Sequence, residues 1–487
     1  MSLFRIGSAV VVSQPGYTDA YYYAGVARRL ASGQGLTADF IWNFLEAAPG
    51  GSVPVASHRF WMPLASILQA LGINVLPFID SFRAAQAAEI LVGLLIPILA
   101  YRAARSLGAG PDASLVAAGI AGVGGAFAPG WVSLDSFAPA AVLGSLFFLA
   151  YGRASKGNVE AGALAGLWVG LLFLARAEGA LFGLAVLALL WSRRSRVAGI
   201  AGSSVALAIG VAWLARDLSL GPIPDVFARS ALLVRYEDFF AVAPPTLDAF
   251  VAAMPDVLSA KIAAAGSNLA TFAFAFGLLL VPGMIVAIRG RRAFLEVRAF
   301  AALAVVVYLF QTVVVTLHST RGSYFHSLAA FVPYGVALGV IGTGALLRTV
   351  ERGRVAAVAG IAAAMVLSAF ALAQWDAAFD PPYRDRVAAA RAIPPGRFMA
   401  VDAAAWRWIS RRPVIVTPAD LGPCAISAAS RGAPKWLVLE KVHFSAYGPL
   451  LAGAVLPDYI ATPQVVGDIT IFGLDMAKAK ALCDSGN

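Results

Sequence analysis

Stretches of about 20 apolar residues recur along this chain from Ser81 to Trp375, and none follows. A helix needs about 20 such residues to cross the hydrocarbon layer of a bilayer. Hydrophobic residues make up 60% of the 487 residues and charged residues only 13%. A water-soluble core does not need so much apolar surface. The sequence therefore predicts a mainly α fold, a polytopic transmembrane helical bundle.

The candidate spans all lie between residues 81 and 374. Ten are expected, at 81–104, 112–130, 136–151, 159–175, 179–192, 197–215, 268–288, 298–317, 326–347 and 355–374. Residues 1–13 are apolar but shorter than the ~17 residues that a span normally needs, so they form a short first span or part of a longer one. With them the bundle has about 11 spans. Residues 60–79 form either a further span or a shallow re-entrant segment, and Pro63, Gly72 and Pro77 favour the second.

The connections between the spans alternate in basic content. One set carries fourteen basic residues: Arg102, Arg105, Arg153, Lys156, Arg193, Arg194, Arg196, Arg289, Arg291, Arg292, Arg298, Arg348, Arg352 and Arg354. The opposing short connections carry only Arg176 and Arg321. Since basic loops stay in the cytoplasm, the second set and everything after Trp375 are predicted to lie outside. The net charge of +10 therefore comes largely from the predicted cytoplasmic loops, and no cluster of basic residues predicts nucleic-acid binding.

The chain divides into a transmembrane part, residues 1–375, and a C-terminal soluble part, residues 376–487. Two long outer loops, 14–80 and 216–267, interrupt the first part. In the second part, β-like runs such as RFMAVD, PVIVTP and KWLVLE alternate with helical runs such as AWRWISR, which predicts a small α/β domain. Cys424 and Cys483 both lie there, where a disulfide and two unpaired thiols fit the sequence equally.

Glycines in the spans predict packing rather than nucleotide binding. The run GIAGVGGAFAPG at 119–130 lacks the Lys-Ser/Thr ending of a phosphate loop. Gly162, Gly166 and Gly170 are spaced by four, as in helices that approach closely through small residues.

Ionisable residues gather where the spans meet the outer surface. Asp19 opens an amphipathic helix in the first loop, with Tyr22 and Tyr23 one turn away, although a Thr-Asp pair before a helix is also a cap worth about 1 kcal/mol. Polar residues expected in the same layer are His58, Arg59, Asp135, Arg176, Glu178, His318, Arg321 and His326. Each of these residues also has a purely structural explanation, as a helix cap, as a charge that complements the helix dipole or as an anchor in the lipid headgroups. Together they indicate function, because charges at membrane depth are costly, and Glu89 joins them or pairs locally with Arg83.

The segments TDAYYYAGVARRLASGQGLT, SHRFWMPLASILQALG, SLDSFAPAAVLGSLFFLAY and LARAEGALFGLAVLAL resemble the GT-C glycosyltransferases that use polyprenyl-phosphate sugars. That group includes protein O-mannosyltransferases and lipid A aminoarabinose transferases. The resemblance implies that Asp19 is the catalytic base and Asp135 a second outer acid. The chain departs from the family at Ala20, where Asp-Glu is the more usual pair, and at WMPL, which replaces Lys-Pro-Pro-Leu. Arg59 or His58 would then supply the missing cation.

The resemblance implies an inverting glycosyltransferase that moves a sugar from a polyprenyl-phosphate donor to an acceptor hydroxyl at the outer face of the inner (plasma) membrane. The expected substrate-binding residues are Asp135, Arg176, Glu178, His58, Arg59, Arg321, His326 and Tyr22. A divalent metal between Asp19 and Asp135 is compatible with this layout and not required by it. Expected partners are the lipid-linked sugar, membrane lipid, a glycan, lipid or protein acceptor, and a membrane protein. Two alternatives remain open, a lipid-linked sugar transporter and a catalytically inactive GT-C-like subunit of a membrane complex.

Overall fold

The computed structural model describes residues 2–46, 52–278, 280–347, 350–430 and 433–486. Residues 47–51 of the first outer loop and Arg348 of the basic set lie outside the described residues. The chain forms two compact units. Unit 1 comprises Met1–Ser13, Trp61–Pro222 and Ala260–Asp376, and unit 2 comprises Gln14–Phe60, Ile223–Ser259 and Ala377–Asn487.

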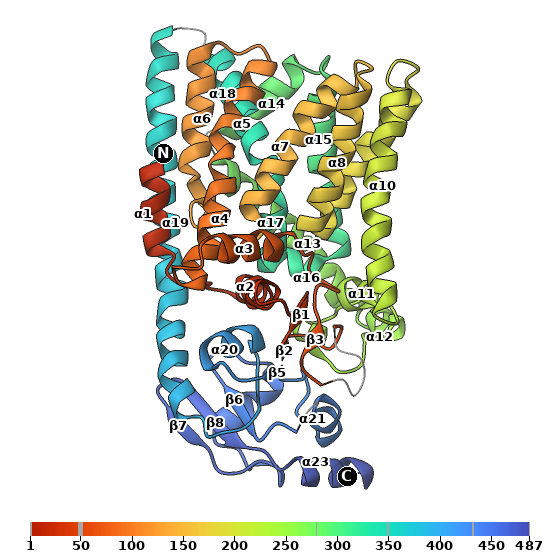
Figure 1. The fold of residues 1–487 in the computed structure, drawn as a ribbon, viewed down its shortest axis with the longest axis vertical. Helices are drawn as coiled ribbons and strands as arrows, with labels where there is room; N and C mark the ends of the chain where they lie inside the picture. Colours follow the sequence, from red (N-terminus) through yellow and green to blue (C-terminus); the bar gives the residue numbers. More distant parts are fainter. Residues whose placement is uncertain (1, 47–51, 279, 348–349, 431–432, 487) are drawn as a thin grey trace. The chain divides into compact units, whose positions relative to one another are not determined.

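Unit 1 is a bundle of helices, several with nearly parallel axes (Figure 1). Among the described residues, seven helices are long and apolar enough to cross a membrane: Ser81–Ser106, Phe137–Ala154, Arg196–Ser219, Met254–Phe276, Leu295–Val314, Thr316–Leu347 and Gly353–Ala392. Shorter apolar helices are Leu64–Val75, Pro111–Phe127, Val159–Ala175, Ala177–Trp191 and Leu280–Gly290. The predicted fold class of a polytopic helical bundle is confirmed. The number of spans, about 11 by the apolar-length criterion, stays a prediction.

Helix α3, Leu64–Val75, occupies the segment for which two interpretations were open. It has 12 residues and begins directly after Pro63. At 1.5 Å per residue this helix is about 18 Å long, less than the ~30 Å of the hydrocarbon layer. Its length therefore agrees with a shallow segment rather than a span.

Helix α13 begins earlier than the sequence predicts. It runs Met254–Phe276, whereas the outer loop was expected to reach residue 267. Polar residues of this helix bond to neighbouring helical segments, since Lys261 Nζ donates to Thr316 Oγ1 at 3.1 Å and the Asn268 amide to Thr312 Oγ1 at 3.0 Å. After Gly277, which has a positive φ of 70°, α14 follows at Leu280–Gly290, so the predicted span 268–288 is two helices.

Helices α8, Val159–Ala175, and α10, Arg196–Ser219, pack closely through glycine. A Cβ added at Gly162 would lie 2.2 Å from the carbonyl oxygen of Ala198, and one added at Gly166 only 1.9 Å from that of Gly202. No side chain fits at either position without moving a helix. The prediction of small-residue helix packing is confirmed here.

Unit 2 is built on a six-stranded sheet with the order β2-β5-β4-β6-β8-β7. Its strands are β2 (Phe40–Ile41), β4 (Phe398–Ala400), β5 (Val414–Val416), β6 (Trp436–Leu439), β7 (Gln464–Val466) and β8 (Ile469–Gly473). The first four strands of this order are parallel, and β8 and β7 are antiparallel additions. The residues of β4 and β5 are all buried, which explains their continuously apolar sequence.

The edge strand β2 comes from the first outer loop and pairs in parallel with β5, Phe40 opposite Val414. The loop that carries Asp19 and the C-terminal residues therefore belong to one compact unit. The second loop joins them, since Asn43 donates to the carbonyl of Phe239 at 2.9 Å and Glu237 accepts from Ser445. This grouping differs from the expected division at residue 376, which placed both loops with the transmembrane part.

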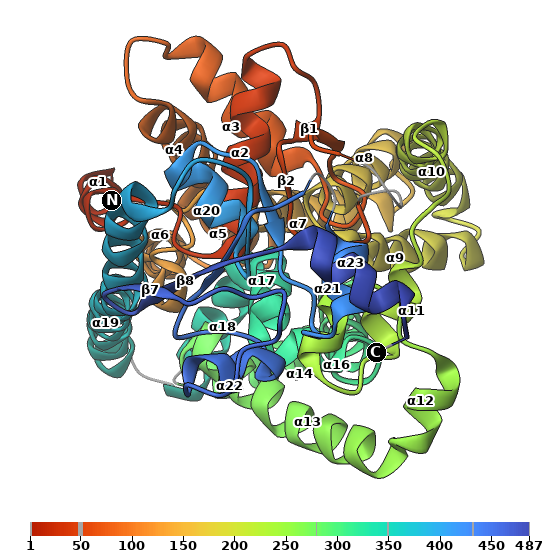
Figure 2. The same cartoon turned by 90° about the horizontal axis from the view of Figure 1, so that it is seen from below.

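Three further helices of unit 2 matter below: α2 (Thr18–Ala31), α20 (Ala403–Ser410) and the end of α19, which runs Val350–Ala392. Figure 2 shows α2 beside α20. Cys424 of α21 (Pro423–Ala429) and Cys483 of α23 (Met476–Asp484) form a disulfide. The question that the sequence left open is thereby answered in favour of a bond.

Candidate functional site

Asp135 and His326 form a buried pair in unit 1. Asp135 lies just before α7, Phe137–Ala154, and its side chain has no exposed surface. The backbone N–H and hydroxyl of Ser136 both donate to Asp135 Oδ1, the hydroxyl at 3.0 Å. The other oxygen, Oδ2, lies 2.9 Å from His326 Nε2. Phe137 stacks on the imidazole at 4.2 Å between ring centroids and fixes the plane of the ring.

The two nitrogens of His326 both face oxygen acceptors. Nδ1 lies 2.8 Å from the carbonyl oxygen of Gly322, which only accepts hydrogen bonds, so Nδ1 carries the proton there. Nε2 faces the carboxylate of Asp135, where two lone pairs would repel each other. The contact is favourable when a proton or a metal cation lies between Nε2 and Oδ2. Gly322 can turn its carbonyl toward the ring because its φ of 112° is a conformation that glycine adopts without strain.

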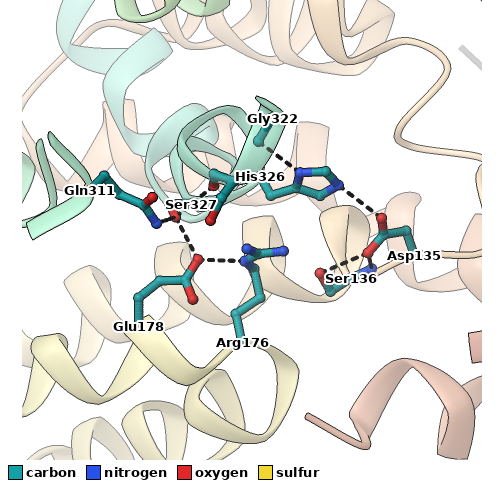
Figure 3. A network of polar contacts seen from close by, with 9 residues as sticks. Asp135, Ser136, Arg176, Glu178, Gln311, Gly322, His326 and Ser327 are labelled. Carbon is teal, nitrogen blue, oxygen red and sulfur yellow. Dashed lines mark hydrogen bonds and ion pairs between the residues drawn. The ribbon is translucent and has the colours of Figure 1, made fainter. Parts of the chain in front are cut away.

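A second polar cluster lies beside this pair, as Figure 3 shows. Arg176, which ends α8, donates from Nε to Glu178 Oε1 at 2.6 Å. The hydroxyl of Ser327 donates to the same oxygen, and the amide of Gln311 donates to that hydroxyl at 2.8 Å. Ser327 follows His326 on α17, Tyr324–Leu328, so one short helix holds both clusters. Ionised side chains that are largely withdrawn from solvent in a membrane helical bundle are costly and usually functional.

Asp19 lies in unit 2, in the first turn of α2, and is half-buried. The N-cap position of this helix is Tyr17, which makes no side-chain capping bond. Asp19 therefore lies inside the helix and not at its N-cap position, and its charge is favourable near the positive end of the helix dipole. The capping interpretation considered from the sequence was wrong, and the interpretation of Asp19 as a functional acid stays a prediction.

Tyr22 and His58 pack together in unit 2, and neither ring has exposed surface. The Tyr22 hydroxyl donates to both oxygens of Glu46, at 2.7 and 2.9 Å, and accepts from the backbone N–H of His58 at 2.6 Å. The backbone N–H of Arg59 donates to Glu46 at 3.2 Å. The Tyr22 ring offers no surface on which a sugar could stack, so its observed contacts are structural.

Three further predicted residues of unit 1 are Arg321, Glu89 and His318, and the Glu89 carboxyl lies close enough to Asp135 for the two charges to interact. Arg321 is exposed, on a kinked segment five residues before His326. Glu89 of α4, Ser81–Gly93, is fully buried and accepts a hydrogen bond from Gln69 at 3.1 Å. His318 is nearly buried in the same helical region as Arg321.

Three residues of these clusters were not predicted from the sequence: Gln311, Ser327 and Glu46. Gln311 could have been identified from the sequence, because it is a polar residue within the apolar run 298–317. Ser327 adjoins His326, but serine is too common in membrane helices to be a signal by itself. Glu46 is the only acid in the run FIWNFLE, and nothing local indicates that it is buried.

The donor atoms of Asp135 and His326 fit a divalent metal. Carboxylate oxygen and imidazole nitrogen are common ligands of such ions, at about 2.1 Å from the metal. Two ligands at that distance and at right angles to each other lie about 3.0 Å apart, close to the observed 2.9 Å. The pair would therefore supply two ligands on adjacent positions of one ion.

No protein-family model matches the sequence, and no curated protein sequence matches it. Solved structures match over most of the chain. ArnT from Cupriavidus metallidurans bound to undecaprenyl phosphate has a TM-score of 0.59 at 14% identity, with 97% of each chain covered. The archaeal oligosaccharyltransferase AglB from Archaeoglobus fulgidus, in complex with an inhibitory peptide and a dolichol-phosphate, has a TM-score of 0.53 at 13% identity, covering 90% of this chain and 69% of that one. The Archaeoglobus fulgidus oligosaccharyltransferase in complex with Zn and sulfate has a TM-score of 0.53 at 14% identity, covering 94% and 71%.

Proposed function

Since the chain has the GT-C fold, we propose that it is a membrane glycosyltransferase that moves a sugar from a polyprenyl-phosphate donor to an acceptor hydroxyl. The observation that carries this proposal is the buried Asp135–His326 pair beside Arg176 and Glu178 in a membrane helical bundle. Two similar structures hold undecaprenyl phosphate and dolichol-phosphate, which supports a lipid-linked donor here.

In the proposed reaction Asp19 is the general base. Its carboxylate takes the proton of the acceptor hydroxyl as that oxygen attacks the anomeric carbon, and the bond from this carbon to the phosphate oxygen breaks. The transition state is oxocarbenium-like, and attack from the opposite face inverts the configuration. The leaving group is an anionic lipid phosphate, so cations stabilise it and no general acid is needed.

Arg176, Arg321 and Arg59 are the cations proposed for the donor phosphate. Glu178 holds the Arg176 guanidinium at 2.6 Å and so fixes its direction. The proposal does not extend to Tyr22 and His58, because their rings are fully buried against each other. Asp135 and His326 would hold a divalent metal, which would supply positive charge for the donor phosphate.

The proposed site faces the outer side of the inner (plasma) membrane, together with unit 2. The alternation of basic loops supports this orientation. A lipid-linked donor keeps its chain in the bilayer while its sugar phosphate meets an acceptor from water, so the reaction belongs at that interface. The acceptor would be a glycan, a lipid or a protein.

The test is sugar transfer by the full-length protein in lipid nanodiscs, with a library of labelled polyprenyl-phosphate donors. Asp19→Asn should lower the rate by about 10²- to 10⁴-fold, the usual contribution of a general base. The matched control is Asp80→Asn, at an exposed aspartate whose carboxylate accepts from the first N–H groups of α4. Asparagine caps helices as well as aspartate does, so this control should keep wild-type activity.

Each outcome is informative. Transfer by the wild type that survives in Asp19→Asn would remove Asp19 as the base and leave the transferase standing. Binding of donors without any turnover by the wild type would refute the transferase and favour a transporter or an inactive subunit.

A further inference from the structure

Helix α2, which carries Asp19, lies along α20 of the C-terminal region. Tyr21 of α2 meets the indole ring of Trp408 edge-on, with the ring centroids 6.3 Å apart. One turn from the end of α2, the guanidinium of Arg28 lies over the same indole, 3.1 Å from its centroid. Both contacts bury apolar or weakly hydrated surface, and a cation over the face of an indole is attracted by the electrons of the ring.

A carboxylate connects the far ends of the two helices. Asp39 Oδ2 accepts from Arg407 of α20 and lies 3.5 Å from Arg29 Nη1 of α2. Arg29 also donates from Nε to the Thr37 hydroxyl at 2.8 Å, close to strand β2. The C-terminal end of α2 is thus held to α20 and to the loop that enters the sheet.

The beginning of α2 is held by Asp402. The side chain of Thr18, the residue before Asp19, faces the Asp402 carboxylate and favours its charged form. The same carboxylate caps α20 by accepting from the backbone N–H of Ala405 at 3.2 Å. Asp402 therefore joins the first turns of both helices.

A buried ion-pair network fixes Asp402 in turn. Arg386, near the end of α19, lies 3.5 Å from Asp402 and 2.9 Å from Glu440, which follows strand β6. The indole N–H of Trp406 donates to the other oxygen of Glu440. Burial raises the pKa of the Asp402 carboxyl, and the opposing charge of Arg386 lowers it. Arg386 thereby ties the carboxylate to the central strands of the sheet.

We propose that Asp402 is a positioning residue that sets the first turn of α2, and with it the carboxylate of Asp19, for the transfer reaction. The C-terminal α/β region then acts as the support of the catalytic base. This inference rests on the proposed function, because it assigns a purpose to the position of Asp19. A general base misplaced by about 1 Å loses about 10²-fold in rate, although its chemistry is unchanged.

The experiment compares Asp402→Asn with Asp475→Asn in the full-length protein in nanodiscs. Asp475 caps α23 by accepting from Lys478 at 3.0 Å and is exposed, so it matches Asp402 as an N-cap without touching α2. Asparagine keeps both caps. In Asp402→Asn the negative charge that faces Arg386 is removed and the oxygen that faces Thr18 becomes a weaker acceptor, and kcat should fall about 10- to 100-fold with the donor KM unchanged within about twofold.

Thr18→Val keeps the ion-pair network and removes only the hydroxyl. Thr18→Val should reproduce the loss in kcat, whereas Thr18→Ser should keep kcat within about threefold of wild type. The double variant Thr18→Val, Asp402→Asn should lose no more kcat than the single variant with the larger loss. Hydrogen exchange of the α2 amides, measured in the same samples, should be faster in Asp402→Asn and unchanged in Asp475→Asn.

The exchange measurement separates the two proposals, because it needs no turnover. If α2 exchanges faster in Asp402→Asn and the wild type transfers no sugar, Asp402 does position α2 and the proposed transferase activity is refuted. Unchanged exchange in α2, or a Thr18→Val protein with kcat within threefold of wild type, overturns the positioning role. A loss of kcat that is equal in Thr18→Val and Thr18→Ser also overturns it.

Discussion

Glu46 is expected to make the stability of unit 2 depend on pH between about 4.5 and 7. Burial raises the pKa of this carboxyl from the usual 4.5 to about 7, while the hydrogen bonds from Tyr22 and from the backbone N–H of Arg59 oppose the rise. The Tyr22 hydroxyl and the backbone N–H of Arg59 donate to the carboxyl, and the backbone N–H of His58 donates to the Tyr22 hydroxyl. The folded protein thus binds a proton more tightly than the unfolded chain does.

The sign follows from this difference. A carboxyl whose pKa is higher in the folded state stabilises that state at low pH, and the contribution is lost as the pH rises through the folded pKa. A difference between 4.5 and about 7 corresponds to about 3 kcal/mol, which is present below pH 4.5 and absent above pH 7. Glu46→Gln removes the ionisation and should remove this slope.

The assay is the apparent melting temperature of wild type and Glu46→Gln in nanodiscs between pH 4 and 8. The difference between the two proteins isolates Glu46, because other titrating groups cancel. The variant should gain on the wild type by up to about 3 kcal/mol as the pH rises. A difference that stays constant over the whole range would refute a raised pKa.

Two tyrosines on one helix supply a control. Tyr22→Phe removes a donor that favours the ionised carboxyl, so the midpoint of the pH dependence should move upward. Tyr21→Phe removes a buried hydroxyl of the same kind, which donates to Gln14 at 2.8 Å, and should leave the midpoint in place.

Two further predictions concern stability. Gly166→Ala places a Cβ 1.9 Å from a backbone oxygen of α10 and should lower the free energy of unfolding by about 3 kcal/mol. The control is Gly210→Ala on α10, where a Cβ meets nothing within 4 Å, and this variant should be neutral or stabilising. The melting temperatures of the two variants and the wild type in nanodiscs test this prediction. Cys424→Ser with Cys483→Ser opens a loop with a sequence separation of 59 and should cost about 4 kcal/mol in denaturant unfolding. A reductant should lower wild-type stability similarly and leave the double variant unchanged, and equal sensitivity of both proteins would argue against the bond.

Hydropathy predicted the bounds of the apolar helices well where the apolar run is not interrupted by polar residues. The span expected at 159–175 is α8 with the same bounds, and 136–151 is α7 with three more residues at its end. The prediction was wrong at α13, which begins at Met254 inside the expected outer loop, and Lys261 of that expected loop has its partners on a neighbouring helical segment. Local pattern carries no information on such partners.

The pairing of β2 with β5 was beyond prediction for a related reason. Phe40 and Ile41 form a strand of two residues, too short for an alternating pattern, and their partners Val414 and Ile415 lie far along the chain. Likewise the sequence singled out Asp135 and His326 separately, and only the fold joins them at 2.9 Å across 191 positions. Residue type indicates which groups are costly to bury, but the three-dimensional structure decides which groups face them.

This arrangement determines how the C-terminal region can be studied. Truncation before residue 377 would remove α20 and also β5, the strand that pairs with the first outer loop. Loss of activity in such a protein would follow whether the region binds an acceptor, recruits a partner or supports α2, so truncation does not distinguish these roles. Asp402→Asn leaves the sheet and the cap of α20 in place, and Thr18→Val also leaves the ion pair of Asp402 with Arg386 in place, so a loss of kcat shared by the two variants points to the contact between Thr18 and Asp402.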